Sequence, residues 1–302
     1  MIFCYQAYGL QVKSEVELPE LLASTAQRKP DDVFIETGLN SERRFSNEER
    51  VGPFLWASVN RVRLKVPGIA EYVIENGTRI CFEPLDESEL QGARALLHSF
   101  AFPCLLYQRG FVVLRGNAIA NERTCCLLIG PTGIGKSTLA AAMLLYGFVS
   151  LSDEIIAIDD GGYCHQGISW LRLWPDAIQT LKLPFRQESR VRPKIEKRYY
   201  VNGPLSSTGP RAISLVIQLG ARNHISRKAS IRELAGVEKA AHLQHSNFSW
   251  PISSKTGLKA EHSKQIWEIG RDIKMFQAIR ASGTDTISDM LGSVLGVVSA
   301  SE

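Results

Sequence analysis

The sequence predicts an α/β protein with a smaller β-rich domain at its amino terminus. Residues 1 to about 85 contain short apolar or alternating runs separated by Gly, Pro, Asn and Asp, which is typical of strands and turns. After Gly110, strand patterns alternate with helical patterns around a glycine-rich segment, which is typical of an α/β core. We therefore divide the chain into a β-rich domain (1–85), a helical connection (86–110) and an α/β domain (111–302).

The composition is that of an ordinary globular protein. The chain has 302 residues, of which 44% are hydrophobic and 22% are charged. A formal net charge of +4 without a dense Lys/Arg run gives no reason to expect nucleic acid as a partner. Because no secretory leader and no run near the roughly 18 apolar residues of a membrane span is present, we expect a cytoplasmic protein with no membrane partner.

The six cysteines and six histidines do not have the spacing of a metal site. The cysteines lack CxxC pairs, so we expect reduced and mostly buried thiols. His242 and His245 are three residues apart on an expected helix, but no Cys or acidic partner stands nearby. No zinc site is predicted.

Three runs in the first 85 residues predict strands, namely 33–36, 62–66 and 72–75. The charged segment 39–53 is expected to be an exposed loop or a short surface helix. Residues 87–108 have apolar residues near helical spacing, interrupted at Pro103, and predict a helix that packs on the core.

The α/β core is expected to begin with strands at 111–120 and 124–129, followed by a glycine-rich loop, a helix and a strand at 148–159. Further along, the pattern predicts a strand within 211–220, a helix at 237–244, a strand at 273–281 and a terminal helix at 285–298.

The glycine-rich loop matches G-x-x-x-x-G-K-[ST], the pattern of a phosphate-binding loop. In such a loop backbone N–H groups surround the phosphates, Lys136 reaches the β and γ phosphates, and the Ser137 hydroxyl binds Mg²⁺. An apolar strand precedes the pattern and an Ala/Leu-rich helix follows it, as the mechanism requires. A glycine turn without a ligand would give Lys136 no role. The matching residues are Gly130, Pro131, Thr132, Gly133, Ile134, Gly135, Lys136, Ser137 and Thr138.

Two adjacent carboxylates, Asp153 and Glu154, stand where the strand after the loop helix begins. Such a pair can divide two tasks, one acid near Mg²⁺ and the other accepting the proton of an attacking hydroxyl. The alternative is two solvated acids at the start of a strand.

The segment GPTGIGKSTLAAAMLLYGFVSLSDEIIAI resembles the core of HPr kinase/phosphorylase, whose phosphate loop is followed by an Asp-Asp pair. From YQAYGL through QRGFVVLRGNAIA and LRLWPDAI, the chain is similar to the HPr-kinase-like proteins of lasso-peptide biosynthesis. The resemblance implies a P-loop kinase core of the HPr kinase/PEP carboxykinase type that uses ATP and Mg²⁺. It also implies that Asp153 is the catalytic base and that Glu154 lies near the metal, while the loop motif itself makes Lys136 a catalytic residue.

The chain departs from that family in three places. Arg115 stands where the kinases have histidine, Glu154 replaces an aspartate, and the carboxy-terminal signature linked to phosphorolysis is not visible, so we do not expect dephosphorylation. Arg115 is either a fixed positive charge for a phosphate or an ordinary surface arginine.

Three other signals are weaker. Asp159 to Gly162 fits the D-x-x-G of GTPases but has the composition of a hairpin turn, and no N/T-K-x-D motif follows, so adenine is preferred. The basic segment 185–200 is either an anion-binding segment, in which Lys197 and Arg198 are the first candidates, or a solvated loop. Trp170 and Trp174 could shape a peptide pocket, but large aromatic residues near an apolar run are usually packing residues, so we do not assign them to a site.

These patterns leave three functions open. The preferred one is ATP-dependent phosphorylation of a serine hydroxyl on a peptide or protein partner, which the resemblance extends to a lasso-type precursor peptide. A kinase of a small molecule or carrier protein would use the same residues. A nucleotide-binding module that regulates a partner without phosphoryl transfer is the third. The sequence leaves oligomer formation possible.

Overall fold

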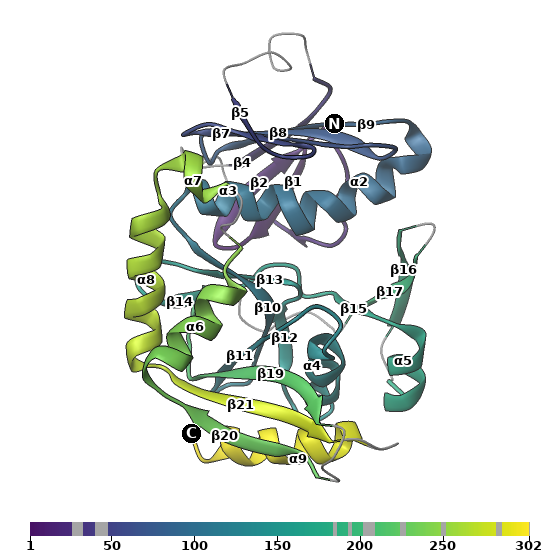
Figure 1. Cartoon of the computed structure of the whole chain (residues 1–302). Helices are drawn as coiled ribbons and strands as arrows, with labels where there is room; N and C mark the ends of the chain where they lie inside the picture. Colours follow the sequence, from purple (N-terminus) through teal and green to yellow (C-terminus); the bar gives the residue numbers. More distant parts are fainter. Residues whose placement is uncertain are drawn as a thin grey trace.

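The computed structural model describes residues 1–25, 33–39, 48–183, 186–192, 195–201, 209–223, 228–248, 252–281 and 286–301. Figure 1 shows a β-sheet layer at the top, a helical run beneath it, and a second sheet with helices on both sides below. A β-hairpin projects beside the helical run (Figure 1).

The upper layer is a sheet of nine strands in the order β3-β1-β2-β4-β9-β8-β7-β6-β5. Neighbours are antiparallel except that β4 runs parallel to both β2 and β9. The strands are β1 (Phe3–Ala7), β2 (Leu10–Ser14), β3 (Leu22–Ala23), β4 (Val33–Thr37), β5 (Glu49–Gly52), β6 (Leu55–Ala57), β7 (Arg61–Val66), β8 (Ala70–Glu75) and β9 (Arg79–Pro84).

The three predicted strands of this layer are present as β4, β7 and β8. The prediction for 39–53 is partly wrong, because residues 49–52 form the edge strand β5, paired antiparallel with β6. Strand pairing supplies the backbone partners that a charged surface strand needs, so a polar sequence does not exclude an edge position. Residues 40–47 of that prediction lie outside the described residues.

The helical run follows as η1 (Glu87–Glu89), α2 (Leu90–Leu96), the π-helical turn η2 (Leu97–Ala101) and α3 (Phe102–Gln108). The predicted helix is confirmed, but Pro103 does not interrupt it. The wider π turn lies just before this proline, which has no N–H to donate, and the helix continues in α3. Its inner face packs on the upper sheet, where Leu97, Ala101 and Leu105 are fully buried.

The lower sheet follows the order β18-β14-β13-β10-β11-β19-β21-β20, with β12 also paired to β10. The parallel neighbours are β11, β19 and β21, and the other pairs are antiparallel. The strands are β10 (Val112–Ala120), β11 (Cys125–Ile129), β12 (Val149–Ser152), β13 (Ile155–Ile158), β14 (Tyr163–His165), β18 (Arg211–Ala212), β19 (Leu215–Asn223), β20 (Ser230–Leu234) and β21 (Lys274–Ala281).

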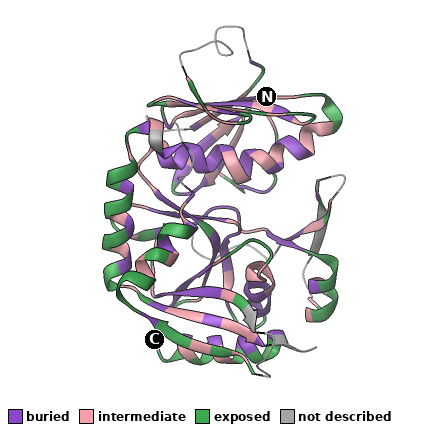
Figure 2. Cartoon of the chain, viewed as in Figure 1, coloured by how far each residue is buried: buried purple, intermediate pink, exposed green. Residues whose placement is uncertain are grey.

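Helices cover both faces of the lower sheet. Helices α4 (Lys136–Leu144) and α9 (Thr286–Ser299) share one apolar cluster with it, and α6 (Gly236–Ser246) and α8 (Lys259–Asp272) share another. Strand β11 contributes Cys126 and Leu128 to the first cluster and alternating residues to the second, which explains its uninterrupted apolar sequence. Figure 2 shows the buried strands between helices with exposed outer faces. The short helix α7 (Ser253–Thr256) precedes α8.

A small third sheet has the order β15-β17-β16, from β15 (Leu171–Leu173), β16 (Arg186–Arg192) and β17 (Ile195–Val201), with α5 (Pro175–Leu181) nearby. The alternative of a solvated loop at 185–200 is therefore wrong for the two strands. The predicted turn at Asp159 to Gly162 is confirmed, because Gly162 N–H donates to Asp159 O at 3.0 Å between the antiparallel strands β13 and β14.

The upper and lower layers share one apolar core. Val113 of β10, Ala157 of β13 and Phe248 belong to the same buried cluster as the helical run and the upper sheet. Five of the six cysteines are buried, as predicted, and Cys4 is half-buried. In the described part of the chain, no helix is long and apolar enough to cross a membrane.

Candidate active site

The glycine-rich loop connects β11 to α4 at one edge of the lower sheet. Gly130, Gly133 and Gly135 have φ angles of 138°, 81° and 108°, a region that side chains rarely adopt. A Cβ on Gly130 would lie 2.6 Å from the Leu219 carbonyl oxygen of β19, whereas Gly133 and Gly135 would meet nothing within 4 Å. The loop is therefore packed against the sheet at its start and open toward solvent near the helix.

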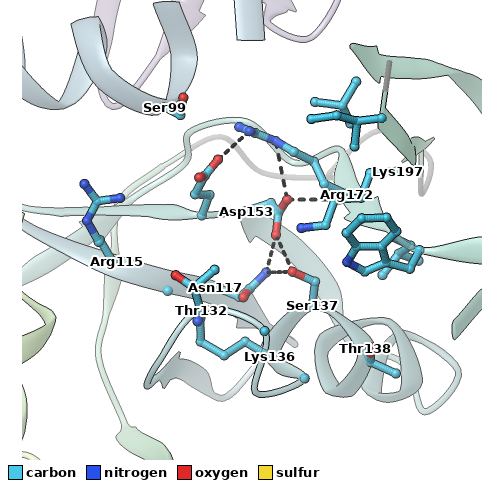
Figure 3. Close-up of a pocket in the computed structure, with 18 residues that line it drawn as sticks. Ser99, Arg115, Asn117, Thr132, Lys136, Ser137, Thr138, Asp153, Arg172 and Lys197 are labelled. Atoms are coloured by element: carbon cyan, nitrogen blue, oxygen red, sulfur yellow. Dashed lines mark hydrogen bonds and ion pairs between the residues drawn. The ribbon is translucent and has the colours of Figure 1, made fainter. Parts of the chain in front are cut away.

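The open side of this loop borders a cavity of about 350 Å³ (Figure 3). The loop supplies Thr132, Gly133, Gly135, Lys136, Ser137 and Thr138, and the other predicted residues on the cavity are Arg115, Asp153, Glu154 and Lys197. Gly130, Pro131 and Ile134 belong to the loop but do not line the cavity, and Ile134 packs on the core instead. Arg198 does not line it either. Arg198 neighbours Lys197 on β17, where successive side chains point to opposite faces.

Asp153 connects the acidic pair to the phosphate loop. Its side chain is 2% exposed. Ser137 Oγ donates to Asp153 Oδ1 at 3.0 Å, Asn117 Nδ2 donates to the same oxygen, and the backbone N–H of Arg172 donates to Oδ2 at 2.9 Å (Figure 3). Burial raises the pKa of Asp153, and the Arg172 charge opposes that shift.

Glu154 lies in a bend that separates β12 from β13, both of which pair with β10. It has a φ of 71°, and its carbonyl accepts the N–H of Gly116 at 2.9 Å. In an uninterrupted strand the side chains of Asp153 and Glu154 would point to opposite faces. The bend instead brings both to one cavity, where Glu154 forms an ion pair with Arg172 and its side chain remains 37% exposed.

Lys136 begins helix α4, and its ammonium group is folded back on its own loop. Nζ donates to the carbonyl oxygens of Gly130 and Pro131, both at 2.9 Å. Burial lowers the pKa of Lys136, and the nearby charges of Asp153 and Glu154 oppose that shift. The ammonium group would have to turn away from these carbonyls to reach a phosphate.

Arg172 of β15 is a site residue that no sequence motif indicated. Its side chain is 9% exposed, and its Nε lies 3.8 Å from Asp153 Oδ2. Among the described residues this Nε finds no hydrogen-bond partner. A buried guanidinium nitrogen without a partner is costly, and an anion in the cavity would satisfy it.

Asn117, Ser99 and Trp174 also line the cavity and were not predicted. Asn117 could have been predicted from the sequence, because it is two residues from the candidate Arg115 on an expected strand and therefore lies on the same face. Trp174, interpreted as a packing residue, is 49% exposed, and the Lys197 ammonium lies 5.4 Å from its ring centroid.

The remaining predicted residues have simpler surroundings. The exposed Arg115 guanidinium lies 4.8 Å from the ring centroid of Phe248. Trp170 packs edge-on against Tyr199 with ring centroids 5.8 Å apart, as a packing residue would. In the described ranges no group of three or more His, Cys, Asp or Glu could hold a metal ion by itself.

No protein-family model and no curated protein matches the chain. Among solved structures, the chain is similar to the Hpr(Ser) kinase/phosphatase from Coxiella burnetii, at 10% sequence identity over 61% of this chain and 96% of that chain. The TM-score of this match is 0.27.

Gly130→Ala is expected to destabilise the protein. A side chain at this φ stores roughly 1–3 kcal/mol of backbone strain, and the added Cβ would overlap the Leu219 oxygen. Gly133→Ala is the matched control, because it has the same kind of backbone strain but open space around the Cβ. Thermal unfolding of both variants should give the lower midpoint for Gly130→Ala. Equal midpoints would show that the contact with β19 is unimportant.

Proposed function

We propose that this protein is an ATP- and Mg²⁺-dependent kinase that phosphorylates a hydroxyl group. The observation that carries the proposal is the hydrogen bond of 3.0 Å between Ser137 Oγ and Asp153 Oδ1, at the N-terminus of α4 and on the wall of the cavity. P-loop enzymes hold Mg²⁺ between a loop Ser or Thr and an acid on a nearby strand. The same two residue types meet here in the same relation to the loop.

The donor atoms of this site fit Mg²⁺. Hydroxyl and carboxylate oxygens are the hard ligands that Mg²⁺ prefers, and it commonly uses one or two protein oxygens together with water and phosphate. We therefore assign Ser137 and Asp153 to the metal. Glu154, which the resemblance placed near the metal, lines the same cavity and forms an ion pair with Arg172.

The cavity also fits a triphosphate. The N-terminus of α4 and the backbone N–H groups of an open glycine loop favour anions. Of the described residues on the cavity wall, four carry positive charge and two carry negative charge, which leaves an excess of positive charge for the phosphates. The cations are Arg115, Lys136, Arg172 and Lys197, and the acids are Asp153 and Glu154.

We further propose that the acceptor is the serine hydroxyl of a peptide, of the lasso precursor type. The sequence resemblance supports this acceptor, and the exposed Trp174 beside Lys197 offers a peptide an aromatic surface and a positive charge at the cavity. Such a kinase would work in the cytoplasm, where Mg·ATP and newly made precursor peptides are present.

The test is transfer of labelled γ-phosphate. The full chain, Mg·ATP and precursor peptides encoded near its gene should give a peptide that carries one phosphate on serine, detected by mass spectrometry. Transfer to small hydroxyl compounds or carrier proteins but to no peptide would favour the second kind of kinase. If nucleotide binds and label never leaves it, even to water, the protein is a nucleotide-binding regulatory module.

Asp153→Asn is expected to raise the Mg²⁺ concentration required for half-maximal turnover by at least tenfold. The amide keeps the shape of the side chain but loses the negative charge beside Ser137, and one lost charge-assisted contact is worth roughly 1.5–3 kcal/mol. A magnesium titration of ATP turnover measures the change. An unaltered magnesium requirement would remove Asp153 from the metal site.

A further inference from the structure

We propose that Glu154, not Asp153, accepts the proton of the attacking hydroxyl, and that Arg172 holds Glu154 inactive until a triphosphate takes over the guanidinium group. The inference rests on the proposed kinase function and assigns the two acids of its site in the opposite order from the family resemblance. It depends on the contacts of three side chains, Asp153, Glu154 and Arg172.

Asp153 is too enclosed to take the proton of a hydroxyl that arrives from the cavity, because its side chain is only 2% exposed and both of its oxygens accept hydrogen bonds from the protein. Ser137 and Asn117 donate to Oδ1, while Oδ2 accepts the Arg172 N–H and faces its guanidinium. The contact from the Arg172 N–H is a backbone contact, so it cannot open unless β15 moves. Asp153 is therefore placed to orient Ser137 and the metal.

The Glu154 side chain is partly exposed to solvent, whereas that of Asp153 is buried. The Glu154 side chain is 37% exposed and borders the cavity. Its φ of 71° is a left-handed conformation that strains any residue other than glycine. Strain of this kind is concentrated at functional sites. Here it turns the second acid to the same side as the phosphate loop, where an incoming hydroxyl would arrive.

Arg172 is the ion-pair partner of Glu154. The pair is close, yet Glu154 Oε2 and Arg172 Nε are both buried atoms without a hydrogen bond in the described structure. The Arg172 guanidinium is thus paired with Glu154 by charge, while its Nε still lacks a hydrogen-bond acceptor among the described residues. Phosphate oxygens accept the planar guanidinium fork well and carry more negative charge than one carboxylate. A triphosphate on the loop should therefore attract Arg172 away from Glu154.

The reaction then balances as follows. The hydroxyl O–H bond breaks, its proton passes to a Glu154 carboxylate oxygen, and the hydroxyl oxygen forms a bond to the γ-phosphorus. The bond from that phosphorus to the oxygen bridging to the β-phosphate breaks, and this oxygen leaves with ADP. Glu154 returns the proton to solvent and pairs again with Arg172 after ADP has left.

The test compares Glu154→Gln with wild type at saturating Mg²⁺. Turnover of ATP, to peptide or to water, should fall by roughly 10²–10⁴-fold, the usual effect of losing a general base. Glu154→Asp should recover part of this loss. Binding of adenylyl imidodiphosphate with Mg²⁺, measured by calorimetry, should become several-fold tighter in Glu154→Gln, because Arg172 no longer has a competing partner.

The double variant supplies the control. Arg172→Gln alone should weaken nucleotide binding. When Glu154→Gln is added to Arg172→Gln, it should no longer tighten nucleotide binding, because the ion pair between the two residues is already lost. Full turnover in Glu154→Gln, or weaker binding of the analogue, would overturn the inference while leaving the kinase function intact. Absence of phosphoryl transfer by the wild-type chain would instead refute the function, and the inference with it.

Discussion

Lys136→Ala is expected to abolish turnover and to weaken nucleotide binding about ten- to hundredfold. Lys136 supplies the point charge for the β and γ phosphates in the proposed complex, and a charge-assisted hydrogen bond contributes roughly 1.5–3 kcal/mol. Its ammonium group donates to Gly130 O and Pro131 O, both at 2.9 Å, and would exchange these contacts for phosphate oxygens in the proposed complex. Phosphate transfer and analogue binding measure the two effects separately.

Lys264→Ala is the matched control for Lys136→Ala. Lys264 lies on α8 with a side chain that is 66% exposed, and its ion pair with Glu268 at 3.9 Å is of the weak surface kind. It should leave turnover and binding unchanged. Wild-type turnover in Lys136→Ala would show that the glycine-rich loop does not bind phosphates.

Much of the fold could be predicted, because many of its strands and helices bury one apolar face, and this face gives their sequences a regular apolar pattern. The helices α6 and α9 and the strand β21 coincide closely with their apolar patterns. Strands β5, β16 and β17 were not predicted, because they are short or carry many charged residues and their pairing with neighbouring strands is not encoded locally. Tyr199 and Tyr200 of β17 are buried, but they stand within a charged run and show no apolar alternation.

In the site, too, residues within one local motif could be predicted, and residues brought in from distant parts of the chain could not. Gly130 to Thr138 is a local motif, so its residues could be named from their spacing. Arg172 is far from that motif in the chain and reaches it only because β15 crosses the end of the bend at Asp153. The contacts of Asp153 and Glu154 with Arg172 therefore could not be predicted from the sequence. Without these contacts, the sequence could not show which acid binds the metal and which accepts the proton.

A chain of contacts connects Tyr8, in the turn between β1 and β2 of the upper sheet, to the acidic pair. Tyr8 is fully buried, and its ring centroid lies 5.9 Å from that of Phe102. Its N–H donates to Gln166 O at 2.6 Å, and its ring packs so closely over Gly167 that a Cβ there would lie 2.2 Å from it. The next residue, Ile168, accepts the Asp153 N–H at 2.8 Å.

Removal of residues 1–85 is therefore expected to leave an insoluble or early-melting chain. It would expose the inner face of the helical run, and each large apolar side chain returned to water costs roughly 1.5–3 kcal/mol. Solubility and thermal unfolding of the truncated chain measure this bracing role. If the segment instead positions a peptide, the truncated chain should stay folded, bind nucleotide normally and lose only kcat/KM for the peptide.

Tyr8→Ala in the full chain separates these two roles without requiring the truncation to fold. Loss of a large buried aromatic side chain destabilises a protein by roughly 3–5 kcal/mol, and here the cavity would open beside the backbone that supports Asp153. Bracing predicts that thermal stability and nucleotide affinity decrease together. Peptide positioning predicts that both stay constant while the peptide KM rises. A Tyr8→Ala chain with unchanged stability, nucleotide affinity and peptide kinetics would show that the upper sheet supports the site by neither route.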